Sequence, residues 1–392
     1  MASIAEAATA VEVDRLPEVV ATLRAAEQPD GHEGARAAAI AGLLAHPAIA
    51  VEVVPVLPGR PNVVARVRGR DRGPGVLLDG HCNSGYHPGP WSGDPRRPWV
   101  ADGRLHGGAV SDMLGGLAAM ILGLRAVADH GPPPGDVVLL AGMHADTNGL
   151  GTKVALASRD DWPAFGICGD PTDLDVVTHH GGAVKFEIEL TGRAAHISRR
   201  EEGIDALAAA AEVARALPGT AFAQADPAAW PSLAGLPCLV VGELQAGTSP
   251  ALVADRAVLR GDVRTLPGMT TAGVLEDLDA RAASAIGPGV GHAARLLVEQ
   301  PPFLDVGSGP LVAAILAASA AHGARRPEVG APLPARRYCT EAADMARAGI
   351  ASVVYGPGDW RWAPDESVAL ADLATAARVY ATVAATLGLE EA

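Results

Sequence analysis

Three short apolar segments of the sequence end in polar residues, and this pattern constrains the fold more than any other feature. The segments cover residues 75–79, 136–146 and 165–171, and a helical pattern over 112–129 separates the first two. Continuous apolar runs of this length are typical of buried parallel strands. The sequence therefore predicts an α/β fold whose mostly parallel sheet is flanked by helices, with polar residues at the carboxyl ends of the strands, where such folds build sites.

The middle of the chain changes to a different pattern. Residues 184–192 alternate apolar and polar side chains, as a half-exposed antiparallel strand does. The β-α-β-β-α-β order that follows is typical of a ferredoxin-like module of about 110 residues. We therefore expect a split first domain of residues 1–182 and 302–392, and an inserted domain of residues 183–301.

Charge and composition exclude several classes of protein. The 31 basic and 45 acidic residues give a formal charge of −14 at pH 7, which does not suit a nucleic-acid partner. No run reaches the roughly 18 apolar residues of a membrane span, and the N-terminal residues lack the basic segment of a signal peptide. The four cysteines form no CxxC pair. We expect a soluble, cytoplasmic protein with no nucleic-acid or membrane partner.

Polar clusters at the predicted strand ends offer the residue types of a metal site. They lie at residues 80–83, 111–113, 144–146 and 169–172 and contain imidazole and carboxylate groups. Three such ligands and a water are the usual arrangement of a catalytic zinc ion. A His or Asp at the end of a strand also serves as a cap or turn residue, so spacing alone leaves both interpretations open.

Together with further motifs in a fixed order, these clusters resemble the M20 metallopeptidase family, near its acetylornithine deacetylase and succinyl-diaminopimelate desuccinylase members. The resemblance covers nearly the whole chain and implies a catalytic domain with an inserted lid that forms a dimer. It also implies hydrolysis of amides by two zinc ions, which share a bridging Asp and an activated water, and by a Glu that acts as general base. The motifs are GHCN…W…DP, DGRLHGGAVSDMLGG, HADTNGLGT, GDPTDL…HHGG, TGRAAHIS, GDVRTLPG, YCTEA and GPG…PDE.

One of the two metal sites that the resemblance implies is complete in this sequence. His81 matches the first His ligand, Asp112 the bridging Asp, and Asp170 the acidic ligand of the same metal. The resemblance therefore implies one zinc ion per chain, held by these three residues.

The other half of the centre departs from the family pattern. Ala145 stands where the family has its general base, and Asp146 stands where it has a Glu ligand. Trp362 falls where the distal His is expected, and an indole nitrogen has no lone pair for a metal. The second zinc site is therefore predicted to be lost, and His144 or Asp146 is the candidate that replaces the missing base.

Other positions suggest how a substrate is bound. Asn83 replaces the Asp that orients the first His, and it lines the predicted pocket together with Trp362. Arg264 offers a bidentate partner for a carboxylate. The resemblance implies that Glu341 binds a substrate amine and that His196 reaches the partner's active site in a homodimer formed through the inserted domain.

Three functions fit this pattern of retained and lost residues. The first is metal-dependent hydrolysis of the amide of a small N-acyl amino-acid-like substrate. The second is a repurposed enzyme of a specialised pathway that catalyses cyclisation, amide formation, elimination or acyl transfer, because loss of the water-activating Glu is what such a change requires. The third is a metal-free pseudoenzyme or binding protein that kept only the fold.

Overall fold

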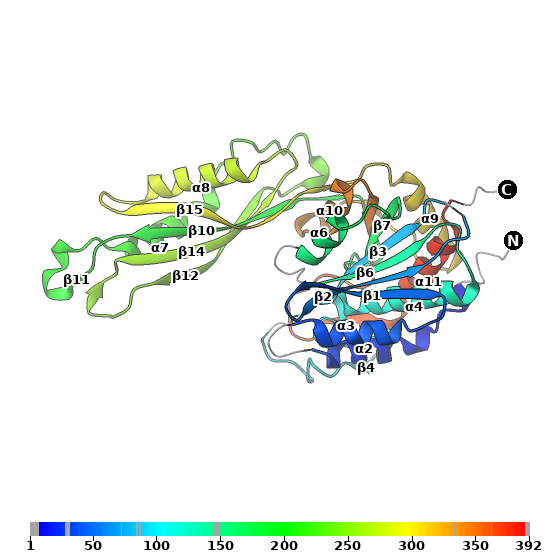
Figure 1. Ribbon diagram of the computed structural model, residues 1–392. Helices are drawn as coiled ribbons and strands as arrows, with labels where there is room; N and C mark the ends of the chain where they lie inside the picture. The colour runs from blue at the N-terminus through cyan, green and yellow to red at the C-terminus, as the bar shows by residue number, and fades with distance from the viewer. Residues whose placement is uncertain are drawn as a thin grey trace. The chain divides into compact units, whose positions relative to one another are not determined.

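The computed structural model of the chain contains two compact units (Figure 1). The first consists of residues 1–179, 304–335 and 340–392, and the second of residues 180–303 and 336–339. The sequence predicts the boundaries between the domains at 182/183 and 301/302, and it assigns residues 336–339 to the first domain. The residues that the structure describes are 8–27, 32–71, 73–83, 85, 88–143, 149–332, 334–361 and 363–388.

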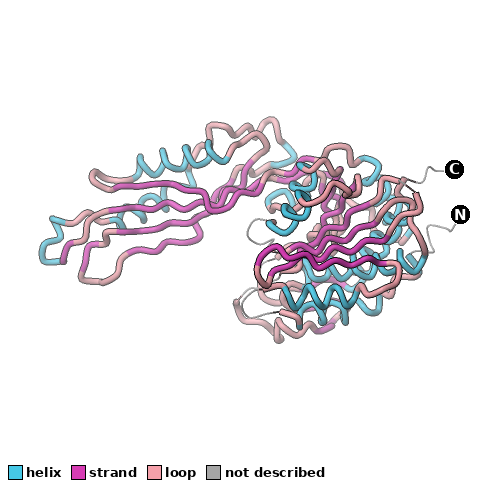
Figure 2. The backbone as a smooth tube through the Cα atoms, in the orientation of Figure 1, coloured by secondary structure: helices cyan, strands magenta, loops and turns pink. Residues whose placement is uncertain are grey.

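An eight-stranded sheet forms the centre of the first unit (Figure 2). The pairs β3–β6, β3–β7, β7–β18 and β8–β17 are parallel, whereas β1–β2, β2–β6 and β18–β8 are antiparallel. In sheet order the strands are β1 (Ile49–Leu57), β2 (Arg60–Val67), β6 (Val137–Gly142), β3 (Val76–His81), β7 (Phe165–Cys168), β18 (Ala351–Val354), β8 (Val176–Val177) and β17 (Val329–Gly330). The mostly parallel sheet expected from the apolar segments is confirmed.

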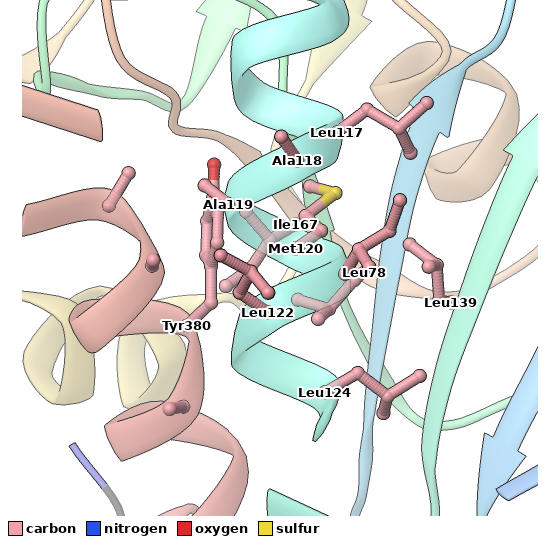
Figure 3. Close-up of a cluster of buried hydrophobic side chains, with 14 of the residues drawn as sticks. Leu78, Leu117, Ala118, Ala119, Met120, Leu122, Leu124, Leu139, Ile167 and Tyr380 are labelled. Carbon is pink, nitrogen blue, oxygen red and sulfur yellow. The ribbon is translucent and has the colours of Figure 1, made fainter. Parts of the chain in front are cut away.

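Helix α4 (Gly115–His130) packs against this sheet and supplies much of the core. Leu78 and Leu139, from β3 and β6, lie on one side of α4, and Tyr380 of α11 lies on another (Figure 3). By length and composition alone, residues Val110–His130 could cross a membrane. However, 89% of the apolar 18-residue window within this segment is buried inside the protein. This burial is what a core helix shows.

The remaining elements of the first unit flank the sheet or connect its parts. The other helices among its described residues are η1 (Val13–Arg15), α2 (Leu16–Ala25), α3 (Gly34–Leu43), η2 (Val110–Leu114), α6 (Leu150–Ala157), α9 (Gly309–Ala321), α10 (Ala342–Arg347) and α11 (Leu370–Thr386). A small sheet contains β4 (Trp99–Ala101), β5 (Arg104–His106) and β19 (Ser367–Ala369). The chain passes between the units at β9 (His179–His180), β16 (Phe303–Leu304) and η6 (Ala335–Arg337).

The second unit is an antiparallel sheet with two helices on one face. Its strand order is β12-β14-β10-β15, and along the chain the order is β-α-β-β-α-β. Alternate residues of β10, such as Phe186 and Ile188, join the apolar cluster under the helices. Asp205 and Thr270 cap the helices by accepting hydrogen bonds from Ala208 and Gly273 backbone N–H groups. The bounds are β10 (Gly182–Thr191), α7 (Ala206–Ala216), β12 (Cys238–Ala246), β14 (Arg256–Thr265), α8 (Thr271–Ala285), β15 (Gly291–Gln300), β11 (Ala195–His196), β13 (Leu252–Val253), η3 (Ile197–Glu202), η4 (Leu217–Gly219) and η5 (Pro231–Leu233).

The other face of this sheet carries a charged cluster centred on Glu187. Its side chain is 1% exposed and accepts hydrogen bonds from Arg260 (2.8 Å) and from Arg295. Burial alone would raise the pKa of Glu187, but the hydrogen bonds and positive charges of the two arginines outweigh it and hold this pKa below the usual 4.5. The carboxylate therefore stabilises the unit wherever it is ionised.

We expect Glu187→Gln to cost about 1–2 kcal/mol in the free energy of unfolding of this unit near neutral pH. Because the pKa is lowered in the folded state, the contribution is full above the unfolded pKa and is lost as pH falls through the folded value. Urea unfolding of the whole chain at several pH values measures this. Glu189→Gln, at an exposed pair on the same strand, is the control with little expected change. An equal effect of the two changes would contradict the role of Glu187.

Candidate metal centre

Two neighbouring strands place an imidazole and a carboxylate at one edge of the first unit's sheet. Strands β3 and β7 run parallel, with Asp79 paired with Cys168. His81 is the last residue of β3, and Asp170 follows the end of β7 by two positions. Because the two strands end side by side, the side chains that follow them meet, and His81 Nε2 lies 3.6 Å from Asp170 Oδ1.

The turn before α4 adds a second carboxylate to this pair. Asp112 lies in η2, and its Oδ1 is 3.3 Å from His81 Nε2. Helix α4 approaches the end of β7 closely at Gly116, where a Cβ atom would lie only 2.6 Å from the carbonyl oxygen of Gly169. A larger residue at position 116 would push the turn that carries Asp112 away from Asp170.

The three side chains have the separations that a zinc ion requires. One ligand atom from each of His81, Asp112 and Asp170 lies within 4.8 Å of the other two. In a tetrahedral site with bonds of about 2.0–2.2 Å, neighbouring ligand atoms are about 3.3–3.6 Å apart. The distances of 3.3 and 3.6 Å from His81 Nε2 match this spacing, and one nitrogen with two oxygens is a donor set that zinc accepts. The residues present therefore fit a zinc ion.

The orientation of the His81 ring leaves the correct nitrogen for a metal. Its Nδ1 lies 3.1 Å from the backbone oxygen of Asn83, which can only accept, so Nδ1 carries the proton. Nε2 then faces the two carboxylates. Burial would lower the pKa of His81, but the hydrogen bonds to Asp112 and Asp170 outweigh it and raise the pKa well above its usual value. A cation is therefore favoured between these three side chains, either as a proton or as a metal.

Asp112 is held on its other side by an indole group. Trp360 Nε1 donates a hydrogen bond of 2.5 Å to Asp112 Oδ2, the oxygen that does not face His81. The resemblance assigns Asp112 as the residue that bridges two metals, which needs both oxygens. In this chain Asp112 Oδ2 already accepts a hydrogen bond from the indole N–H of Trp360, which cannot itself bind a metal.

A buried glutamate fixes the turn that carries Asp112. Glu366 accepts hydrogen bonds from the backbone N–H groups of Ser111 (2.7 Å), Asp112 (3.2 Å) and Ala109 (3.2 Å). Burial raises the pKa of Glu366 to about 7, although the three backbone donors act in the opposite direction. The residue therefore joins the segment before β19 to the turn that carries Asp112.

Two of the predicted substrate-binding residues of the first unit, Asn83 and Glu341, lie away from bulk solvent. Asn83 is 6% exposed, and Glu341 is 6% exposed at the start of α10. The Glu341 carboxylate lies close to the Asp79 carboxylate and the Cys168 thiol, and one ligand atom of each lies within 4.8 Å of the others. The sequence predicted neither Asp79 nor Cys168 as a site residue.

The two predicted site residues of the second unit, His196 and Arg264, lie in different environments. His196 is exposed, and its Nδ1 accepts the backbone N–H of Ser198 at 3.3 Å, so in the neutral ring Nε2 carries the proton. Such a ring presents an N–H donor to solvent, as an oxyanion partner must. Arg264 is already paired with Asp262 through Nε (3.0 Å) and Nη2 (3.2 Å), and its Nη1 lies 3.6 Å from Cys339 Sγ.

Three of the predicted site residues lie outside the described residues. These are His144, Asp146 and Trp362, and Ala145 lies in the same segment as the first two. Their roles stay predictions.

The sequence suggests Trp360 only as a side chain that packs in the pocket, and it indicates neither the hydrogen bond of Trp360 to Asp112 nor the roles of Glu366 and the backbone carbonyl of Asn83. The PDE motif contains Glu366, but nothing in the spacing indicates that its carboxylate reaches back to residues 109–112. Asn83 was considered only for its side chain, whereas its backbone oxygen holds His81. Glu366 lies between β18 and β19, and no sequence pattern indicates its contacts or the partner of Trp360.

Comparison with known proteins agrees with this arrangement. The model of peptidase family M20/M25/M40 matches residues 85–386, which is more than half of the chain. The chain therefore belongs to this family, and the resemblance seen in the sequence is confirmed.

Relatives and solved structures support the same assignment. Acetylornithine deacetylase of Vibrio campbellii is 30% identical over 226 residues, or 57% of this chain, and the chain spans only 59% of that relative's length. Acetylornithine deacetylase of Vibrio vulnificus is 28% identical over 342 residues, covering 81% of this chain and 82% of the relative. The crystal structure of human carnosine dipeptidase 1 has a TM-score of 0.78 over 98% of this chain and 100% of its own, at 13% identity, which shows that the fold is shared.

Proposed function

We propose that this chain is a zinc-dependent amidohydrolase that removes the acyl group from a small N-acyl amino acid. The observation that carries the proposal is the spacing of His81 Nε2 from Asp112 and Asp170, which fits one zinc ion. Zinc bound there would polarise the amide carbonyl and lower the pKa of the attacking water. The names of the relatives, acetylornithine deacetylases, support an Nα-acyl basic amino acid as the first substrate class to examine.

A single zinc ion per chain at the catalytic centre is part of this proposal. Asp112 Oδ2 is engaged by Trp360, and Trp362 replaces the His that the resemblance assigns to the second metal. The general base is then His144 or Asp146, since Ala145 has no side chain that accepts a proton. Either would take a proton from water as the water attacks the carbonyl carbon.

The remaining predicted residues would bind and orient the substrate. Arg264 would pair with the substrate carboxylate by the donors that Asp262 leaves available. Glu341 would bind an amine, and Asn83 and Trp362 would line the pocket. His196 would donate its Nε2–H to the oxyanion in the partner's active site, which requires a homodimer formed through the inserted unit. We propose that the dimer is soluble and cytoplasmic.

A repurposed, non-hydrolytic enzyme is the second candidate, and the replacement of the family's Glu by Ala145 is the observation that favours it. Without a group that activates water, the same pocket would bind an amide or amine and direct another nucleophile to it. The products separate the two candidates, because hydrolysis releases a free carboxylic acid and the alternatives do not.

The test is a panel of Nα-acetyl and Nα-succinyl amino acids, led by Nα-acetylornithine, incubated with zinc-loaded protein. We expect release of the acid at a rate that falls to background after removal of zinc by a chelator and returns when zinc is restored. Substrate loss without release of the acid would support the second candidate. Absence of any turnover and of bound zinc would contradict the proposed function.

The contact between Trp360 and Asp112 gives a separate prediction. Trp360→Phe removes the indole donor, so Asp112 loses the group that fixes its carboxylate. We expect zinc affinity to fall by about 10-fold or more, as for other partners of metal ligands. Because Trp360 is 39% exposed, the thermal midpoint should change little. Competition with a chromophoric chelator measures the affinity, and Trp162→Phe is the matched control. Equal zinc affinity of Trp360→Phe and wild type would contradict this role.

A further inference from the structure

A second cluster of metal-binding side chains lies in the first unit, and the proposed hydrolysis does not use it as a metal site. Its members are Asp79 of β3, Cys168 of β7 and Glu341 at the start of α10. One ligand atom from each lies within 4.8 Å of the other two. Asp79 and Cys168 are paired residues of adjacent parallel strands, so the fold brings them together.

The cluster is buried and has few partners for its negative charges. Asp79 is 1% exposed, Cys168 is 0% and Glu341 is 6%. The Asp79 carboxylate accepts hydrogen bonds from the Thr152 hydroxyl, at 3.2 and 3.5 Å. Within the part of the chain that the structure describes, the Glu341 carboxylate has no hydrogen bond or ion pair with another residue. A buried carboxylate without a partner is costly, so a site built this way requires protons or a cation.

The electrostatic environment agrees with this requirement. The carboxylates of Asp79 and Glu341 are like charges in one buried cluster. Asp170 adds a third carboxylate, whose Oδ2 lies 3.1 Å from Cys168 Sγ. A proton or a cation is therefore needed to offset the negative charges of Asp79, Glu341 and Asp170.

We propose that Asp79, Cys168 and Glu341 form a second, buried zinc site. The thiol decides the class of metal, because thiolate ligands favour zinc, whereas magnesium and calcium take oxygen ligands. A divalent ion there would offset the buried carboxylates and thiolate. Its ligands differ from those of the second family site, which the resemblance places at Asp112 and at the positions of Asp146 and Trp362.

Asp170 connects the two centres. Its Oδ1 lies 3.6 Å from His81 Nε2, whereas its Oδ2 lies 3.1 Å from Cys168 Sγ. The second ion would therefore have Asp170 Oδ2 within reach as a fourth ligand, which completes the number that zinc usually takes. Since all three other ligands are buried, we assign this ion a structural role that holds Asp170 in position. This assignment gives Glu341 a different role from the amine binding proposed above, and the experiment below separates the two roles.

Cobalt substitution tests the second site, because a thiolate bound to Co²⁺ gives an intense near-ultraviolet charge-transfer band that nitrogen and oxygen ligands do not. Wild-type protein loaded with Co²⁺ and freed of excess metal is expected to hold two ions per chain and to show the band. Cys168→Ser should lose the band and one ion, whereas Cys82→Ser, at another buried cysteine, should keep both. His81→Ala should lose one ion and retain the band, so failure of the proposed catalytic site would be seen separately.

Glu341→Gln provides a second variant with nearly unchanged size and shape. We expect it to lose the second ion, with a weaker band at the same cobalt concentration, while circular dichroism reports an intact fold. A wild-type protein without the band, or a band that survives Cys168→Ser, would overturn the proposal. Two ions and a full band in Glu341→Gln would also overturn it and would leave Glu341 to the substrate amine.

Discussion

Replacement of Asp112 or Asp170 by alanine is expected to remove zinc from the catalytic site and to reduce amide hydrolysis by about 10³-fold or more. The size follows from the several kcal/mol that a metal contributes when it stabilises charge in the transition state. Each substitution removes one of the two carboxylate oxygens that lie 3.3 and 3.6 Å from His81 Nε2. Zinc content by mass spectrometry and turnover of Nα-acetylornithine measure the two effects on the same preparation.

A neighbouring acid provides the matched control for these variants. Asp173 follows Asp170 on the same loop, but its side chain is 67% exposed and pairs with Arg325. Its φ of 55° favours asparagine as the replacement, so the control is Asp173→Asn. This variant should keep its zinc and nearly all of its activity. Full activity in either alanine variant would contradict the assignment of Asp112 and Asp170 as ligands.

Ala145→Glu is expected to raise kcat/KM for Nα-acetylornithine by about 10²-fold. The reason is that a positioned general base typically contributes about 10²–10⁴-fold, and the resemblance places the family's base at this position. His144 and Asp146 would serve as weaker substitutes in the natural chain. Steady-state kinetics of released acetate measures the gain.

Ala145→Gln controls for the size of the new side chain, because its amide cannot accept a proton from water near neutral pH. We expect no gain for this variant. An equal gain for Glu and Gln would show that proton transfer is not the missing function. No gain with Glu, in protein that retains zinc, would favour a pocket repurposed for non-hydrolytic chemistry.

The sequence predicts the central sheet well because its strands carry a strong local pattern. Strands β3, β6 and β7 are rich in apolar residues, and the structure buries them almost completely. The start of α4 is less accurate: the pattern predicted a helix from Asp112, but the α-helix begins at Gly115. Asp112 and Met113 have non-helical backbone angles, which apolar periodicity does not report.

The candidate metal site could be proposed from sequence because its ligands follow recognisable motifs. The environment of those ligands could not, since it depends on contacts between distant segments. Trp360 reaches Asp112 across 248 residues, and Glu366 reaches Ser111 across 255. Such pairs leave no trace in periodicity or spacing, and only the folded chain shows them.

The buried cluster of Asp79, Cys168 and Glu341 could not be predicted from the sequence for the same reason. In the sequence, Asp79 and Cys168 each stand in an apolar strand and Glu341 before a short helix, so each has an ordinary local role. Their chemistry depends on the pairing of β3 with β7, which places the first two residues side by side.

Anomalous diffraction at the zinc absorption edge, from crystals of zinc-loaded wild-type protein, would locate the catalytic zinc ion. We expect a peak about 2.0–2.2 Å from His81 Nε2 and from one carboxylate oxygen each of Asp112 and Asp170. A well-ordered structure with zinc in the crystal and no peak between these three side chains would contradict this expectation.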